Sequence, residues 1–229
     1  MPPLELASAL LSLVIIDLVL SGDNALVIGM AAHRLPPPQR RLAIILGGIG
    51  AVVLRVVLTA LTTLLLLIPA LKLVGGVLLA WIAFKLLKQE EETGDAVASA
   101  GSLWGALRTI IAADFIMSLD NVLAIGGAAH GHVELLVGGL LLSMPLVLFS
   151  GGLFAELINR FSWLAYVGTA VIAYTAGQMV VEDPLLHSYV EAQPLLAALV
   201  PPLVVAIVLP AAHWFHRHRV PRTTIGSPS

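Results

Sequence analysis

The chain has 229 residues, of which 59% are apolar and only 11% are charged, and its formal net charge is −2. About a quarter of the residues of a soluble domain are charged, so this composition, with a mean hydropathy of +0.98, excludes an ordinary soluble globule and predicts a polytopic membrane protein. The chain has no cysteine, which excludes disulfides, thiolate metal sites and thiol nucleophiles and leaves oxygen and imidazole as the strong ligands.

The apolar stretches predict seven membrane-spanning helices, because a bilayer core needs about 20 helical residues. In chain order, the expected spans are residues 6–32, 42–68, 70–88, 103–129, 134–157, 163–180 and 194–214. No Lys or Arg precedes the first span, so we expect a retained helix and not a cleavable signal peptide. The fold class that follows is an all-α polytopic membrane protein.

Polar and proline-rich segments divide these spans. The three prolines at 36–38 separate the first two spans, whereas Pro69 and Lys72 alone mark a tight turn before the third. Residues 89–102 are acidic and rich in Gly, Ala and Ser, which predicts a cytoplasmic linker near the middle of the chain. The seventh span has four prolines and no acid in its body, and we expect it to be a peripheral addition.

The positive charges predict the orientation in the membrane. With the N-terminus outside, 10 of the 12 Lys and Arg residues fall on the cytoplasmic side, Lys72 falls outside and Arg55 lies within a span. We therefore expect a multi-pass protein of the cytoplasmic (inner) membrane, with its N-terminus outside and its C-terminus in the cytoplasm.

One polar motif occurs twice within the apolar spans. Residues 17–33 recur 97 positions later as residues 114–130, and 10 of the 17 positions are identical, among them two Asp, one Asn, one Ser and one His. Because three spans separate the starts of the two copies, the second copy runs in the opposite direction, as in transporters built from inverted repeats. The expected organisation is a three-helix repeat in 1–88, the linker 89–102, a second, inverted three-helix repeat in 103–180, and a seventh helix with a basic cytoplasmic tail in 181–229.

The acids of this motif are candidate metal ligands. A carboxylate inside a bilayer costs about 2.5 to 3.5 kcal/mol, so four of them in symmetric positions need a function. Asp17 and Asp114 each lie roughly 16 Å into their spans, near the membrane centre. Carboxylate and amide oxygens suit hard divalent cations such as Mg²⁺, Ca²⁺ or Mn²⁺. The predicted metal path consists of Asp17, Asp23, Asn24, Asp114, Asp120 and Asn121.

Helical spacing constrains the directions in which these side chains point from the helix. The first Asp, the Ser and the Asn of each copy fall on one helix face. Asp23 and Asp120 lie about 240° round from the first Asp of their copies. Either the helix is unwound at this point, which Gly22 would permit in the first copy, or each of these acids faces a different neighbour.

A second rank of residues could line the path or act as a counter-ion: Ser21, Ser118, Arg55, His33 and His130. We interpret Arg55 as a fixed counter-ion to one Asp, since a guanidinium group has no acceptor. Four Asp against this single Arg leave a formal charge of −3 if all are ionised, which predicts uptake of protons or metal. Competition between the two for the same carboxylates would couple them. We interpret the two His as solvated helix ends, with an entry ligand as the alternative.

These residues resemble those of the TerC family of membrane proteins. The resemblance rests on residues 17–24 and 114–121, on Arg55 in a Gly-rich second span, and on the segment Tyr174 to Gly177 at the end of the sixth. It covers nearly the whole chain. It implies a metal-ion exporter, chiefly of Mn²⁺, within a larger group of exporters that share a 3+3 repeat, and it implies the same six residues as the metal path. We expect no permanently bound cofactor, with Mn²⁺ as the favoured substrate and Ca²⁺ or Mg²⁺ as alternatives.

Other classes stay open at this point. An exporter of a small organic cation, such as a basic amino acid, would also use buried acids. An intramembrane aspartyl protease needs two Asp on separate helices, but such enzymes use a Gly-x-Gly-Asp context, whereas Asp23 follows Leu-Ser-Gly and Asp120 follows Met-Ser-Leu. A non-transporting scaffold subunit would need no charged core. We therefore expect a transporter and not an enzyme, with the lipid bilayer and a metal ion as partners and no nucleic acid.

Overall fold

The computed structural model describes residues 10–12, 14, 15, 17, 18, 21–61, 68, 70–93, 102–128 and 133–219, and in these residues all regular structure is helical. The helices are α2 (Gly22–Ala32), α3 (Pro37–Ala60), α5 (Leu71–Thr93), α6 (Leu103–Ala128), α7 (Val133–Arg160), α8 (Trp163–Val181), α9 (Pro184–Ala192) and α10 (Pro194–Arg219). Residues 10–12, 14, 15, 17 and 18 are also helical. The predicted all-α class is confirmed for the described part of the chain.

Several helix boundaries differ from the predicted spans for local reasons. Helix α3 begins at Pro37 and not at residue 42, because a proline in the first helical turn lacks only an N–H that has no helical partner. Helix α5 continues to Thr93, beyond the expected end at residue 88. Helix α9 was not predicted, although Asp183 caps it and Pro184 follows, which is a recognised start signal.

Four helical segments in the described part of the chain are long and apolar enough to cross a membrane: Pro37–Thr59, Val137–Arg160, Trp163–Val181 and Leu195–Phe215. Their outer faces carry large apolar side chains, such as Val53 on α3 and Ile207 on α10, which are 58% and 59% exposed. In a bilayer these side chains would contact lipid. The count of seven spans stays a prediction.

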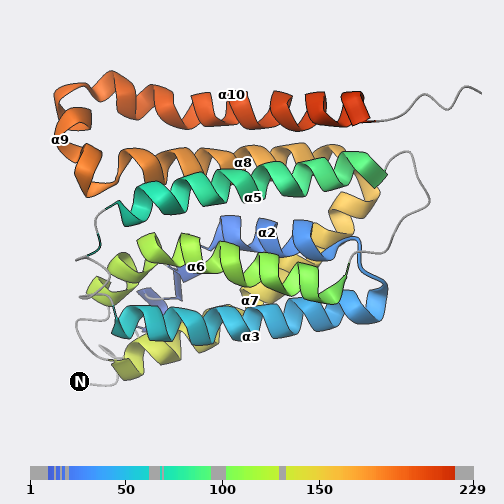
Figure 1. Ribbon diagram of the computed structural model, residues 1–229. Coiled ribbons are helices and arrows are strands. Elements are labelled where there is room, and N and C mark those ends of the chain that lie inside the picture. Colours follow the sequence, from blue (N-terminus) through green and yellow to red (C-terminus); the bar gives the residue numbers. More distant parts are fainter. Residues whose placement is uncertain are drawn as a thin grey trace, which may run out of the picture.

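The helices form a bundle of roughly aligned rods, with α10 covering α8 and α5, and α2 lying inside the bundle (Figure 1). In this view α2 and α6 run in opposite directions, as do α3 and α7, and α5 and α8. In the predicted repeat, α2, α3 and α5 correspond to α6, α7 and α8. The contact between α2 and α7 then has an equivalent in the contact between α6 and α3. The inverted repeat stays a prediction, which this pairing of helices supports.

Glycine allows α2 to lie directly against α7. A Cβ atom added at Gly29 would lie 2.7 Å from the Cβ of Phe154, and one added at Gly151 would lie 2.7 Å from a methyl carbon of Ile28. Any side chain at these two positions would push the helices apart. This close crossing holds the polar face of α2 beside the middle of α7.

Candidate cation site

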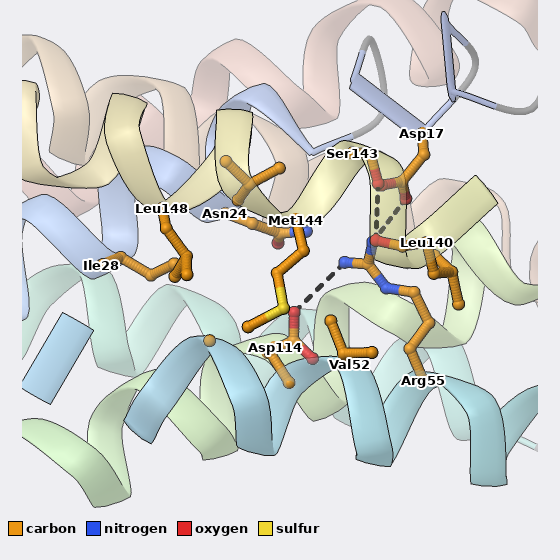
Figure 2. A pocket seen from close by; sticks show the side chains of 13 residues that line it. Asp17, Asn24, Ile28, Val52, Arg55, Asp114, Leu140, Ser143, Met144 and Leu148 are labelled. Atoms are coloured by element: carbon orange, nitrogen blue, oxygen red, sulfur yellow. Dashed lines mark hydrogen bonds and ion pairs between the residues drawn. The ribbon is translucent and has the colours of Figure 1, made fainter. Parts of the chain in front are cut away.

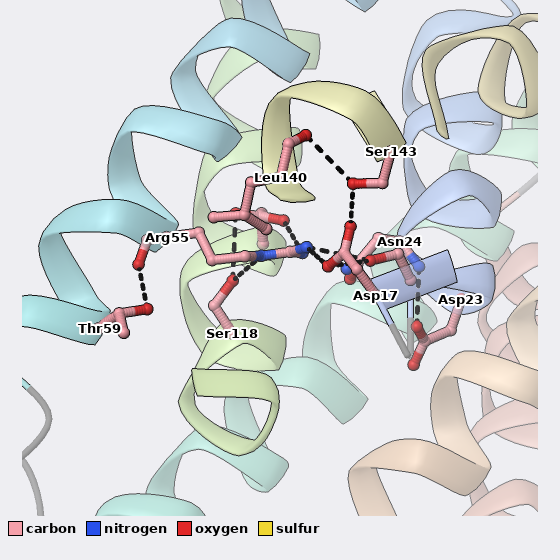
Figure 3. A network of polar contacts seen from close by, with 10 residues as sticks. Asp17, Asp23, Asn24, Arg55, Thr59, Ser118, Leu140 and Ser143 are labelled. Atoms are coloured by element: carbon pink, nitrogen blue, oxygen red, sulfur yellow. Dashed lines mark hydrogen bonds and ion pairs between the residues drawn. The ribbon is translucent and has the colours of Figure 1, made fainter. Parts of the chain in front are cut away.

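A buried network of charged and hydroxyl side chains lies where the chain around α2 meets α3, α6 and α7 (Figure 3). At its centre is Arg55 on α3. Its Nη1 donates to Asp17 Oδ1 at 2.5 Å, and its Nη2 donates to Asp114 Oδ1 at 3.2 Å. Asp17 is 2% exposed, and Arg55 and Asp114 are each 6% exposed. The first Asp of each motif copy therefore reaches one guanidinium group. The prediction of a counter-ion to one Asp was too narrow, because Arg55 pairs with both.

The serine of each copy connects its own aspartate to the same guanidinium. Ser21 Oγ donates to Asp17 Oδ1 at 3.3 Å and accepts from Arg55 Nη1 at 3.0 Å. Ser118 Oγ donates to Asp114 Oδ2 at 3.3 Å and accepts from Arg55 Nε at 3.4 Å. The spacing of four residues between Asp and Ser places the two side chains on one helix face, so the two copies present matching arrangements to Arg55.

The helix α7 contributes a hydroxyl group that the sequence analysis did not single out. Ser143 Oγ donates to Asp17 Oδ2 at 2.5 Å and is 1% exposed. Asp17 thus accepts from Arg55, Ser21 and Ser143, whereas Asp114 accepts from Arg55 and Ser118. The two acids have equivalent positions in the motif and share Arg55, but their surroundings differ because Ser143 on α7 donates to Asp17.

A cavity of about 30 Å³ adjoins this network (Figure 2). Its polar lining includes Asp17, Asn24, Arg55, Asp114 and Ser143, and its remaining lining residues are apolar or small. Asn24 is 3% exposed, and neither its amide nitrogen nor its amide oxygen has a hydrogen-bond partner among the described residues. Unpartnered buried amides are rare and call for a water or an ion beside them. The volume is sufficient for a water-sized guest.

Asp23 points away from this cavity. Its Oδ1 accepts from the backbone N–H of Asn24 at 2.9 Å, and its Oδ2 accepts from the hydroxyl of Thr175 on α8 at 3.3 Å. It therefore faces a different neighbour from Asp17, which is one of the two alternatives that the helical spacing left open. Hydrogen bonds between residues four apart continue across Ser21, from its N–H to the Asp17 carbonyl and from the Ala25 N–H to its own carbonyl.

A second polar cluster lies at the end of α2. His33 Nδ1 donates to the Met30 carbonyl, and its Nε2 lies 2.7 Å from Glu90 Oε2 on α5, which also accepts from Arg34 Nη2 at 2.8 Å. Burial acts to raise the pKa of Glu90, but the hydrogen bond and charge of His33, together with Arg34, outweigh it and hold this pKa below its ordinary value of 4.5. His33 is 5% exposed. Contrary to the interpretation as a solvated helix end, it joins α2 to α5.

Part of the predicted path lies outside what the structure describes. The side chains of Asp120 and Asn121 fall outside the described side chains, and His130 falls outside the described residues. Helix α6 itself continues through Asp114 to Ala128 without interruption. Among the described residues, no group of three His, Cys, Asp or Glu side chains is placed to hold a metal ion. Of the six predicted path residues, the structure describes the side chains of Asp17, Asp23, Asn24 and Asp114.

Ser143 and Met144 on α7 line the cavity, although the sequence analysis does not single them out. Both precede Pro145 inside the helix, and proline deprives the preceding helical turn of a hydrogen bond. A serine beside a proline in an apolar span was the available signal. It was not used because α7 carries no acid in this region.

The fold and the network together define a class of protein. Apolar outer faces around a buried cluster of charges are the arrangement of an integral membrane protein with a functional centre. The chain belongs to the integral membrane protein TerC family, whose family model matches residues 3–220. This confirms the family that the motif residues indicated.

Several curated relatives are bacterial membrane proteins. The uncharacterized membrane protein YjbE of Bacillus subtilis (strain 168) is 41% identical over 209 residues, which are 91% of this chain and 95% of the relative. The uncharacterized membrane protein YceF of the same strain is 32% identical over 139 residues, 57% of this chain and 54% of the relative. The UPF0053 inner membrane protein YoaE of Escherichia coli (strain K12) is 25% identical over 193 residues, 72% of this chain and 37% of the relative. No solved structure matches the chain.

Proposed function

We propose that this protein exports a divalent metal ion, with Mn²⁺ as the favoured substrate. One observation carries the proposal. The first aspartates of the two motif copies converge on one cavity, where the buried amide of Asn24 has no partner in the part of the chain that the structure describes. Carboxylate and amide oxygens are ligands for hard divalent cations. The choice of Mn²⁺ and the outward direction follow from the metal-export role that the resemblance to the TerC family implies.

Electrostatics support a cation as the guest. Asp17, Asp114 and Arg55 are all buried, and with both acids ionised they sum to a charge of −1. A buried net charge is unfavourable in a low-dielectric surrounding unless it is compensated. This negative charge attracts a cation into the cavity beside Asn24. We include Asp23, Asp120 and Asn121 in the proposed path as further steps toward the two membrane faces.

The site argues against the alternative functions. A cavity of about 30 Å³ suits an ion or a water molecule and is too small for a basic amino acid. An aspartyl protease needs two acids that share a proton and activate water, whereas Arg55 binds both Asp17 and Asp114. Both alternatives therefore rank below a metal ion.

Proton coupling is a further part of the proposal. Protons and metal compete for the same carboxylates, so an inward proton gradient could drive metal outward. We place the protein in the cytoplasmic membrane, since its relative YoaE is named an inner membrane protein, with the N-terminus outside by the positive-inside rule. Tagging the two termini and testing their accessibility in intact cells checks this orientation.

Flux in proteoliposomes tests the proposal. Purified protein is reconstituted, Mn²⁺ is added outside, and quenching of an enclosed Mn²⁺-sensitive dye is followed, with Ca²⁺ and Mg²⁺ as competitors. We expect Asp17→Asn and Asp114→Asn to slow the flux at least about tenfold, because each removes one negative charge from the site. Glu182→Gln, the same acid-to-amide change at an exposed acid, should leave flux unchanged. Wild-type flux no faster than that of both Asp variants would end the metal-transport proposal.

A further inference from the structure

The guanidinium group of Arg55 occupies the position between the two acids that a shared metal ion would need. It donates to Oδ1 of Asp17 and to Oδ1 of Asp114 through different nitrogens. The same group lines the cavity together with both acids. Figure 2 shows it lying between them, with dashed contacts to each side. The described site is therefore already occupied by a cation that belongs to the protein.

We propose that Arg55 is a tethered competitor of the transported cation. In the metal-free protein it holds Asp17 and Asp114 together, and it leaves at least one of them when a metal binds both. This inference rests on the proposed transport function and adds to it a residue that sets how tightly the ion is held.

The charges of the groups favour this competition. Arginine has donors and no acceptor, and it cannot lose its charge in a protein. A metal ion on the oxygens that Arg55 now contacts would lie beside this fixed positive charge. The other carboxylate oxygens accept from Ser143 and Ser118. Repulsion between the two cations therefore favours withdrawal of Arg55 from at least one acid when the metal binds.

The network offers Arg55 a place to move to. Its Nη1 also donates to Ser21 Oγ at 3.0 Å, and its Nε donates to Ser118 Oγ at 3.4 Å. Both serines are neutral and buried. They can keep hydrogen bonds to the guanidinium while a metal takes the carboxylates. The long side chain of arginine gives the required reach through several rotatable bonds.

A built-in competitor serves a transporter because an ion must leave as well as enter. With Arg55 present, a divalent ion changes the charge of the three side chains from −1 to +1. Without Arg55, it changes the charge of the two acids from −2 to 0, which is electrostatically the better outcome. Arg55 therefore weakens metal binding, and its return to the acids displaces the ion. Conduction requires binding of this moderate strength.

Equilibrium binding and release rates of Mn²⁺ test this role. The purified protein is titrated with Mn²⁺, the free ion is followed by electron paramagnetic resonance, and release is timed by stopped-flow mixing with a chelator. We expect Arg55→Gln to bind Mn²⁺ at least about tenfold tighter than wild type, which corresponds to about 1.4 kcal/mol, and to release it more slowly. Arg55→Lys should fall between the two, since a single ammonium group lacks the two arms that reach both acids.

Controls separate this inference from the proposed function. Arg160→Gln makes the same change at an exposed arginine at the end of α7 and should bind as wild type does. If neither wild type nor Arg55→Gln binds or transports Mn²⁺, the metal-transport proposal fails and the inference falls with it. If wild type transports Mn²⁺ but Arg55→Gln binds it no tighter, only the competitor role is overturned. If Arg55→Gln does not fold, Arg55→Lys decides: binding tighter than wild type supports the role, and equal or weaker binding overturns it.

Discussion

Replacement of Asn24 by Leu separates a ligand-binding role from a structural one. The Asn24 amide is buried, and neither of its polar atoms has a partner in the described ranges of the chain. A buried polar group without a partner costs about 1 to 3 kcal/mol. The apolar variant should therefore stabilise the metal-free protein by a similar amount, and the adjoining cavity of about 30 Å³ offers room for the larger side chain. For a chain of this length, each kcal/mol shifts the unfolding temperature by about 2 to 4 °C.

Thermal unfolding in detergent, followed by tryptophan fluorescence, measures this stability, and Mn²⁺ binding is measured on the same samples. We expect Asn24→Leu to unfold at a higher temperature and to bind Mn²⁺ at least about tenfold more weakly, because the cavity loses an oxygen ligand. Thr169→Val is the matched control: its hydroxyl is also buried and unpartnered, but it does not line the cavity. It should gain stability and keep its Mn²⁺ affinity. An Asn24→Leu protein that is less stable than wild type and binds Mn²⁺ normally would refute the reasoning.

Three further predictions concern the frame around the site. Asp183→Ala should lower stability by about 2 to 4 kcal/mol in thermal unfolding, because its carboxylate accepts backbone N–H groups from α5 and α9 and is fully buried; Asp183→Asn should recover part of the loss, and an unchanged melting temperature would contradict the capping role. Since the pKa of Glu90 lies below its ordinary value of 4.5, its contact with His33 should stabilise the fold fully above about pH 5.5 and progressively less below about pH 4.5; a difference in melting temperature between wild type and Glu90→Gln that does not shrink on acidification would contradict this. Gly76→Ala should destabilise the packing of α5 on α8 by about 1 to 3 kcal/mol, because an added Cβ would lie 2.6 Å from the carbonyl oxygen of Ala176. An unfolding temperature equal to that of wild type would contradict this close contact between the two helices.

The duplicated motif predicts which residues meet, but not which hydrogen-bond and ionic partners they have. The spacing of Asp17 and Ser21 correctly placed them on one face, and the structure brings them to Asp114 and Ser118 through Arg55. A helical period identifies a face and not the helix that covers it. The contact of one arginine with both acids depends on how α3 packs against α6 and α2, which is a property of tertiary packing.

Polar residues at a helix end account for another difference. The charge of the run from Gln89 to Thr93 predicts a linker, yet this run continues α5, where Glu90 gains the partners His33 and Arg34 from the end of α2. Ionic partners from another helix can hold a polar terminal turn that composition alone would leave outside the helix. The start of α9 at Asp183 and Pro184, in contrast, was readable from local capping chemistry.

The central claim is that the aspartates of the two motif copies bind one transported cation. Crystals of the protein grown with Mn²⁺ and measured on both sides of the manganese absorption edge test it most directly. We expect one anomalous peak in the cavity, within coordination distance of Asp17, Asn24 and Asp114, with Arg55 withdrawn from at least one of the two acids. Manganese bound only elsewhere on the protein, with Arg55 still holding both aspartates, would contradict the account.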